Sequence, residues 1–264
     1  RKQVQFMLAV ISPAKKLDFD SPAPFERHSQ PDYLDDAGEL IGDARKLTRT
    51  DLSRLMKISD NLADLNFQRY KAFAPPFDLV NAKQAAYAFN GDTYMGLDAA
   101  SLEEADFTWA QDRLRILSGL YGMLRPLDLM QPYRLEMGTR LQNTRGGDLY
   151  EFWGDSLTRG INAVTAGHED RSLINLASNE YFKAVRPAKL DGPLITPVFK
   201  EIKAGQAKVL GMFAKRTRGA MARFIIENRL EAPEGLKDFT YGGYQYRDDL
   251  SVEFEWVFTR EHGA

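Results

Sequence analysis

The sequence contains no cysteine and only three histidines among its 264 residues. Without cysteine the chain has no disulfide, no cysteine-ligated zinc or iron–sulfur site and no thiol nucleophile, and it fits a cytoplasmic location. The histidines His28, His168 and His262 lie far apart, and none stands at the spacing of a metal or catalytic-triad motif. We therefore expect no metal site, no cofactor and no catalytic residue.

Long hydrophobic runs are missing as well. No apolar stretch approaches the roughly 18 residues that cross a bilayer, so we expect no membrane partner. The run Met7 to Ile11 is too short for a secretory signal, and we interpret Met7 as the natural start and residues 1–6 as upstream sequence. The hydrophobic content of 44% and the charged content of 27% are typical of a globular protein with a sizeable core.

The net charge is only −2, but the basic residues are unevenly distributed. Residues 208–229 carry six basic side chains against Glu227 alone, and residues 113–145 carry six arginines against Asp128 and Glu136. Two such blocks in a nearly neutral chain predict one basic face and an anionic partner.

Short apolar runs and amphipathic segments alternate along the whole chain. We predict a mixed α/β (α+β) fold: one compact domain over residues 7–260, with a central mixed sheet, surrounding helices and a helical insertion at about residues 32–73. The patterns predict strands over residues 7–12, 84–89, 114–117, 171–177, 195–202, 208–214 and 252–258, and helices over residues 97–113, 148–164 and 215–230.

The helical insertion contains two short predicted helices joined at Ile58-Ser59-Asp60 and flanked by basic residues. A helix-hairpin-helix unit of this kind presents backbone N–H groups and cations to DNA phosphates, which makes Arg45, Lys46 and Lys57 candidate DNA contacts. The alternative is a packed helical subdomain without a ligand.

Four further segments carry candidate site residues. Lys15 and Lys16 follow the first predicted strand, and Asn179 to Lys183 follow the strand over residues 171–177, where open α/β sheets bind ligands. Lys215, Arg216 and Arg218 fall in the first turn of a predicted helix, where basic charge opposes the helix dipole. Residues 118–138, with three glycines and two prolines, are either a core connection or a cleft wall that presents Arg125 and Arg134. For the lysines and arginines the alternative is plain surface charge.

Long motifs in this chain resemble the YaaA family of bacterial peroxide stress resistance proteins. The resemblance runs from Met7 to about Arg260 and is carried by MLAVISPAKKLDFDSP, LSGLYGMLRPLDLMQPYRLEMG, DLYEFWGD, INLASNEYFK and AKRTRGAMARFIIENRL. It implies a cytosolic protein that limits damage by lowering unincorporated iron, with a helix-hairpin-helix element matching residues 44–70 and a basic cleft that binds DNA. It implies no settled catalytic activity, and the proline frequent in the family near Arg49 or Thr50 is absent here.

Our leading hypothesis is a monomeric stress resistance protein that limits damage from free iron and binds double-stranded or junction DNA non-specifically. Its predicted DNA contacts are Lys15, Lys16, Arg45, Lys46, Lys57, Arg125, Arg134, Lys183, Lys215, Arg216 and Arg218.

The alternative hypothesis is an enzyme that acts on a small anionic or nucleotide-like substrate in the same cleft. Its predicted ligand pocket is Ser12, Tyr133, Asn179, Glu180 and Tyr181, with Glu180 as a general acid or base or, more simply, as a helix cap. Direct iron storage is disfavoured, because carboxylates alone, such as those of Asp32 to Glu39, bind iron only weakly.

Overall fold

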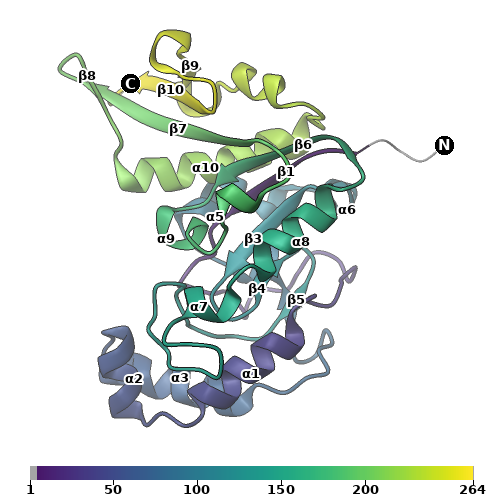
Figure 1. Cartoon of the computed structure of the whole chain (residues 1–264), viewed down its shortest axis with the longest axis vertical. Coiled ribbons are helices and arrows are strands. Elements are labelled where there is room, and N and C mark those ends of the chain that lie inside the picture. The colour runs from purple at the N-terminus through teal and green to yellow at the C-terminus, as the bar shows by residue number, and fades with distance from the viewer. Residues whose placement is uncertain (1–4, 264) are drawn as a thin grey trace.

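A mixed eight-stranded β-sheet crosses the molecule within residues 5–263, the part of the chain that the computed structural model describes (Figure 1). Its strands are β1 (Gln5–Ile11), β3 (Leu114–Ser118), β4 (Gly122–Leu124), β6 (His168–Leu176), β7 (Leu194–Lys203), β8 (Gln206–Lys208), β9 (Gln245–Tyr246) and β10 (Glu255–Glu261). Their order is β4-β3-β1-β6-β7-β10-β9, and β8 pairs with β7. Five strands run parallel, whereas β4, β8 and β9 are antiparallel additions. This arrangement confirms the predicted mixed α/β class and its central mixed sheet.

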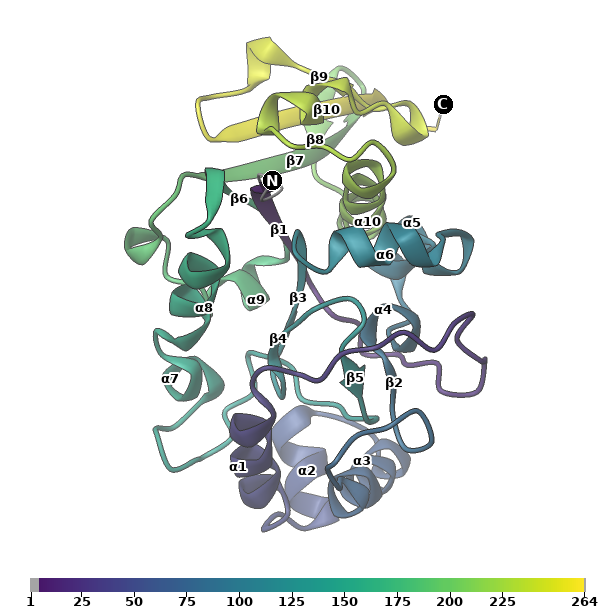
Figure 2. The same cartoon turned by 90° about the vertical axis from the view of Figure 1, so that its right-hand side faces the viewer.

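Helices cover both faces of the parallel strands (Figure 2). Figure 2 shows α7 and α8 on one side and α5, α6 and α10 on the other, while α1 to α3 form one end of the molecule. The helices are α1 (Leu34–Ala44), α2 (Arg49–Met56), α3 (Asp60–Ala72), α4 (Ala85–Ala88), α5 (Asp92–Leu97), α6 (Glu104–Ala110), α7 (Leu149–Trp153), α8 (Ser156–Thr165), α9 (Asn179–Phe182) and α10 (Gly211–Glu227). Within residues 5–263, none of them is long and apolar enough to cross a membrane.

The strands β1, β3 and β6 form the buried centre of the sheet because their apolar runs are covered on both faces. Ile11 at the end of β1 lies beside Ile116 of β3 and Leu176 of β6, so the carboxyl ends of these strands meet at one edge. In the sheet, β3 lies on one side of β1 and β6 lies on the other side, so the strand order changes direction at β1. Such a change of direction is where open α/β sheets bind ligands.

The helical end of the molecule follows its local sequence signals. Thr48 and Asp51 form a reciprocal capping box at the start of α2, and the Ser59 side chain caps α3. Lys57 ends α2 in a left-handed conformation with a φ of 53°, so two helices are joined by a tight three-residue link. A second, two-stranded sheet of β2 (Lys83–Gln84) and β5 (Leu129–Met130) lies between this end and the main sheet.

The core is dominated by aromatic and aliphatic side chains and holds six of the eight methionines. Met95 on α5 and Met212 on α10 are the other two, and their side chains are exposed.

Several predicted elements are wrong in type or extent. The apolar run over residues 84–89 is mostly the short helix α4 rather than a strand, because AAYA is rich in alanine, the best helix former. The predicted helix over residues 148–164 is broken into α7 and α8 at Gly154, whose φ is 48°. The predicted helix over residues 97–113 is the end of α5 and the separate α6, and β8 is shorter than predicted because α10 already begins at Gly211.

Of the residues interpreted as upstream sequence, residues 1–4 lie outside the described part of the chain, and β1 begins at Gln5.

Candidate functional site

Three loops and one helix enclose a cavity of about 550 Å³ beyond the carboxyl ends of β1 and β6. The loops follow β1, precede α5 and follow β6, and the helix is α10. The lining residues are Ser12, Pro13, Ala14, Lys15, Lys16, Asn90, Gly91, Asp92, Thr93, Ser178, Asn179, Glu180, Tyr181, Lys215 and Arg218. Distant segments thus meet at the edge of the sheet where the sequence predicts a ligand.

Hydrogen bonds hold these loops together around Ser12. The Ser178 backbone N–H donates to Ser12 Oγ at 2.8 Å, and the Tyr94 hydroxyl donates to the Ser12 carbonyl at 2.9 Å. The Asn90 N–H donates to the Lys16 carbonyl at 2.9 Å. The cavity is therefore built by contacts that exist without a ligand.

The cationic wall of the cavity is placed by an unusually close approach of α5 and α10. A Cβ atom at Gly219 of α10 would lie 1.7 Å from the Thr93 carbonyl oxygen, and one at Gly96 of α5 would lie 1.9 Å from the Arg216 carbonyl oxygen. Only glycine allows the two backbones to touch in this way. The contact fixes Lys215 and Arg218 beside the start of α5.

Arg218 is half-buried and has no side-chain hydrogen bond or ion pair within residues 5–263. Burial lowers the pKa of its guanidinium, which nevertheless stays charged at neutral pH. Several other half-buried arginines form ion pairs, as Arg134 does with Glu136 and Arg260 with Glu201. An uncompensated cation in a cavity favours an anionic ligand.

The helix that carries these cations begins earlier than predicted. Since α10 starts at Gly211, Lys215 and Arg218 lie in its second turn, where the helix dipole is weak. The expectation of a basic first turn that opposes the dipole is therefore wrong. Lys215 and Arg218 are candidate site residues because they line the cavity.

Glu180 does not cap α9. Its carboxylate Oε1 accepts the Gly138 N–H at 3.2 Å, and its carbonyl accepts the Tyr150 hydroxyl at 2.6 Å. Glu180 thus ties the segment over residues 118–138 to the loop after β6. Its side chain still lines the cavity.

Tyr133 and Tyr181 adjoin the cavity as buried side chains. The Tyr133 and Ser118 hydroxyls are 2.6 Å apart, and burial raises the pKa of both tyrosines. Tyr133 and Arg134 line a small depression that shares Lys15 with the cavity.

Six of the predicted DNA contacts fall on one concave surface, which we call the cationic cleft. It consists of the cavity, the small depression beside it and a third hollow that shares Asn179 and contains Lys183. The cations of the cationic cleft are Lys15, Lys16, Arg134, Lys183, Lys215 and Arg218.

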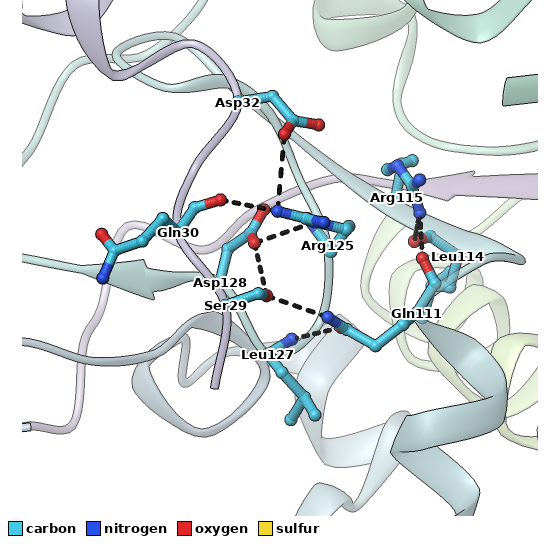
Figure 3. A network of polar contacts seen from close by, with 9 residues as sticks. All are labelled: Ser29, Gln30, Asp32, Gln111, Leu114, Arg115, Arg125, Leu127 and Asp128. Atoms are coloured by element: carbon cyan, nitrogen blue, oxygen red, sulfur yellow. Dashed lines mark hydrogen bonds and ion pairs between the residues drawn. The ribbon is translucent and has the colours of Figure 1, made fainter. Parts of the chain in front are cut away.

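Arg125 lies elsewhere, in a polar network shown in Figure 3. Its Nε donates to Asp128 at 3.0 Å, and a terminal nitrogen donates to the Gln30 carbonyl at 2.6 Å and lies 3.4 Å from an Asp32 oxygen. Asp128 is fully buried and also accepts the Ser29 hydroxyl at 2.6 Å. These contacts anchor the segment over residues 118–138 to the chain that leads into α1.

The remaining predicted contacts are spread over other surfaces. Arg45 donates to the carbonyls of Tyr70, Lys71 and Phe73 and so closes the end of α3, and Lys46 pairs with Asp43 at 3.1 Å. Lys57 is exposed at the link between α2 and α3. Arg216 lines a separate hollow beside the cationic cleft.

The sequence interpretation missed the turn before α5, whose Asn90, Gly91 and Asp92 line the cavity. Asn-Gly-Asp was visible only as a turn signal. Gly91 fits there because an added Cβ would lie 3.0 Å from Ala14 Cβ. Over the described residues, no three His, Asp or Glu side chains come together to hold a metal ion.

Comparison with known proteins places this architecture in a family. A family model described as "Peroxide stress protein YaaA" matches residues 7–250. The chain belongs to the YaaA family. Its relatives in the family include UPF0246 proteins of Magnetococcus marinus, which is 56% identical, and of Alteromonas mediterranea, which is 55% identical. The alignments cover 96% of this chain in both cases, and 99% and 98% of the respective relative. The resemblance found in the sequence motifs is therefore confirmed.

Proposed function

We propose that this peroxide stress protein binds double-stranded or junction DNA non-specifically through the cationic cleft. The carrying observation is that cations from four distant chain segments line one concave surface, and that the Arg218 side chain has no hydrogen-bond or ion-pair partner among the described residues. Lysine and arginine contacts to phosphates carry little sequence information, so binding is independent of base sequence.

The link between α2 and α3 supplies a second contact in this proposal. Lys57 is exposed where the two helices meet, as expected of a helix-hairpin-helix unit that approaches a phosphate backbone. Arg45 and Lys46 belong to the same unit and are engaged by protein groups, so their role is to shape the unit.

Limiting iron damage follows from counterion release. Cations that bind along DNA displace condensed counterions, and these include ferrous iron where it is free. Bound protein thus removes iron from the sites where peroxide would generate radicals. Plasmid nicking by ferrous iron and peroxide should fall as the protein saturates the DNA; nicking that is unaffected at saturation contradicts this step.

The DNA proposal is tested by fluorescence anisotropy with a labelled duplex from 50 to 200 mM salt. The logarithm of the binding constant should fall linearly with the logarithm of salt concentration, by about 0.9 per phosphate contact. Lys215→Gln should reduce that slope by about one, whereas the exposed Lys203→Gln, outside the cationic cleft, should not. An affinity that is flat across this range would rule out the cationic cleft as a phosphate-binding surface.

A further inference from the structure

The cavity at the centre of the cationic cleft has the dimensions of a small-molecule site. Its volume of about 550 Å³ lies within the roughly 300–1,000 Å³ of ligand pockets. Its walls are set by the Ser12 hydrogen bonds and by the contact of Gly96 and Gly219, so they are formed in advance. A surface that only follows a DNA backbone needs no such enclosure.

One wall is suited to a phosphate group. Lys215 and Arg218 are three residues apart on α10 and therefore lie on the same face of the helix. Arginine binds phosphate oxygens through two parallel N–H groups, and lysine adds a point charge. The burial of Arg218 without a partner leaves a desolvation cost that a bound dianion would offset.

Another part of the cavity wall offers hydrogen-bond acceptors. Asp92 and Asn90 line it, and the Asp92 carboxylate forms no hydrogen bond or ion pair within the described chain. A carboxylate accepts hydrogen bonds from hydroxyl and amino groups. Asp92 and Arg218 both line the cavity, and no ion pair joins them.

We propose that this cavity binds a small phosphate monoester that carries hydroxyl or amino donors and has the size of a mononucleotide. Arg218 and Lys215 hold the phosphate, and Asp92 with Asn90 receives hydrogen bonds from the sugar or base. Sugar phosphates and nucleoside monophosphates share this chemistry, and the experiment separates them. The inference adds a ligand to the protein and does not depend on DNA binding.

Isothermal titration calorimetry of the full chain with adenosine 5′-monophosphate, ribose 5-phosphate, inorganic phosphate and adenosine tests the inference. Both monoesters should bind more tightly than inorganic phosphate, and adenosine should bind weakest. Tighter binding of the nucleotide than of ribose 5-phosphate identifies a nucleotide site, and equal binding identifies a sugar phosphate site. No saturable binding of either monoester overturns the inference.

Single substitutions test which part of the cavity wall binds which part of the ligand. Arg218→Gln should weaken both monoesters by about 10-fold or more, since losing a charge-assisted pair costs at least about 1.4 kcal/mol. Asp92→Asn should weaken the binding of both monoesters but leave the affinity for inorganic phosphate unchanged. Lys203→Gln should change none of these affinities. Equal affinity of the Arg218→Gln variant and the unmodified protein would refute the phosphate wall.

Thermal unfolding separates a binding role from a folding role. Without ligand, Arg218→Gln should not lower the unfolding temperature, because it removes an unpaired cation. With a saturating monoester, the unmodified protein should gain stability more than the variant. Equal gains would contradict the inference. If monoesters bind but the DNA titrations fail, the DNA proposal is wrong. If DNA binds but the monoesters do not, the monoester proposal is wrong.

Discussion

Two arginines of equal charge have opposite surroundings in this protein. Arg125 is bound by Asp128, Asp32 and the Gln30 carbonyl, whereas Arg218 faces a cavity and has no side-chain partner within the described part of the chain. A paired cation helps to hold the fold together, whereas an unpaired buried cation favours the binding of an anion. Asp128 lies only three residues from Arg125, but the Gln30 carbonyl that also binds Arg125 is 95 positions away, so the sequence context alone does not reveal the difference.

Replacing Arg125 should destabilise the protein. Arg125→Gln leaves the buried Asp128 carboxylate without its cation, and we expect a loss of about 2 kcal/mol in the free energy of unfolding, less than for a fully buried pair because Arg125 is partly exposed. Urea unfolding measures the loss, with Arg218→Gln as the matched control. Equal effects of the two substitutions would contradict the distinction.

His168 should make stability depend on pH. It is buried, and neither ring nitrogen has a hydrogen-bond partner among residues 5–263. Burial, with Arg113 and Arg115 nearby, lowers its pKa below 6.5. The folded state then binds fewer protons than the unfolded state, so its stabilising contribution is present above pH 6.5 and is lost as pH falls through the folded pKa. Urea unfolding should show that the free energy of unfolding declines less between pH 8 and pH 5.5 for His168→Phe than for the unmodified protein. An unchanged decline would exclude this histidine as the cause.

Among the elements, the contact between α5 and α10 determines the shape of the cavity. Gly219→Ala would place a methyl group against the Thr93 carbonyl and push the helices apart. We expect a loss of about 2 kcal/mol in unfolding free energy together with weaker monoester binding. Gly42→Ala in α1 is the control, because nothing lies within 4 Å of its added Cβ, and it should gain about 0.5–1 kcal/mol. Similar effects at both glycines would show that the close approach is unimportant.

The link between α2 and α3 offers a test with two readouts. Lys57 adopts a φ of 53°, which costs a non-glycine residue about 1–2 kcal/mol, so Lys57→Gly should raise the unfolding free energy by about 1 kcal/mol. If Lys57 contacts DNA as proposed, the same variant should bind duplex more weakly in the anisotropy assay. A more stable variant with unchanged DNA affinity would remove Lys57 from the interface.

Elements with a strong local signal were predictable. The strands β1, β3 and β6 are continuous apolar runs, and the polar residues after β1 and β6 that the sequence singles out line the same cavity. The sequence predicts a strand where α4 lies, because a short buried run has no distinguishing period. The turn at Asn90 to Asp92 was missed as a cavity wall because only the packing of α5 on α10 brings it to Arg218.

At the scale of the whole molecule, the fold class, the central mixed sheet and the family could all be predicted from the sequence. The sequence did not predict which of the cations lie in the cationic cleft and which lie elsewhere. Six predicted contacts share the cationic cleft, while Arg45, Lys46 and Lys57 lie at the helical end shown in Figure 1. Whether a cation faces solvent, a carbonyl or a cavity depends on contacts between distant segments, which no local pattern encodes.

The placement of methionine has a consequence for a protein that works amid peroxide. Cysteine is absent, and six methionines are buried, so the thioethers of Met95 and Met212 are the readily accessible sulfur atoms within residues 5–263. Mass spectrometry after mild peroxide treatment should find sulfoxide at these two positions first, with the fold retained. Early oxidation of Met123 or Met221 would contradict this order. The described part of the molecule thus presents little oxidisable sulfur to an oxidant.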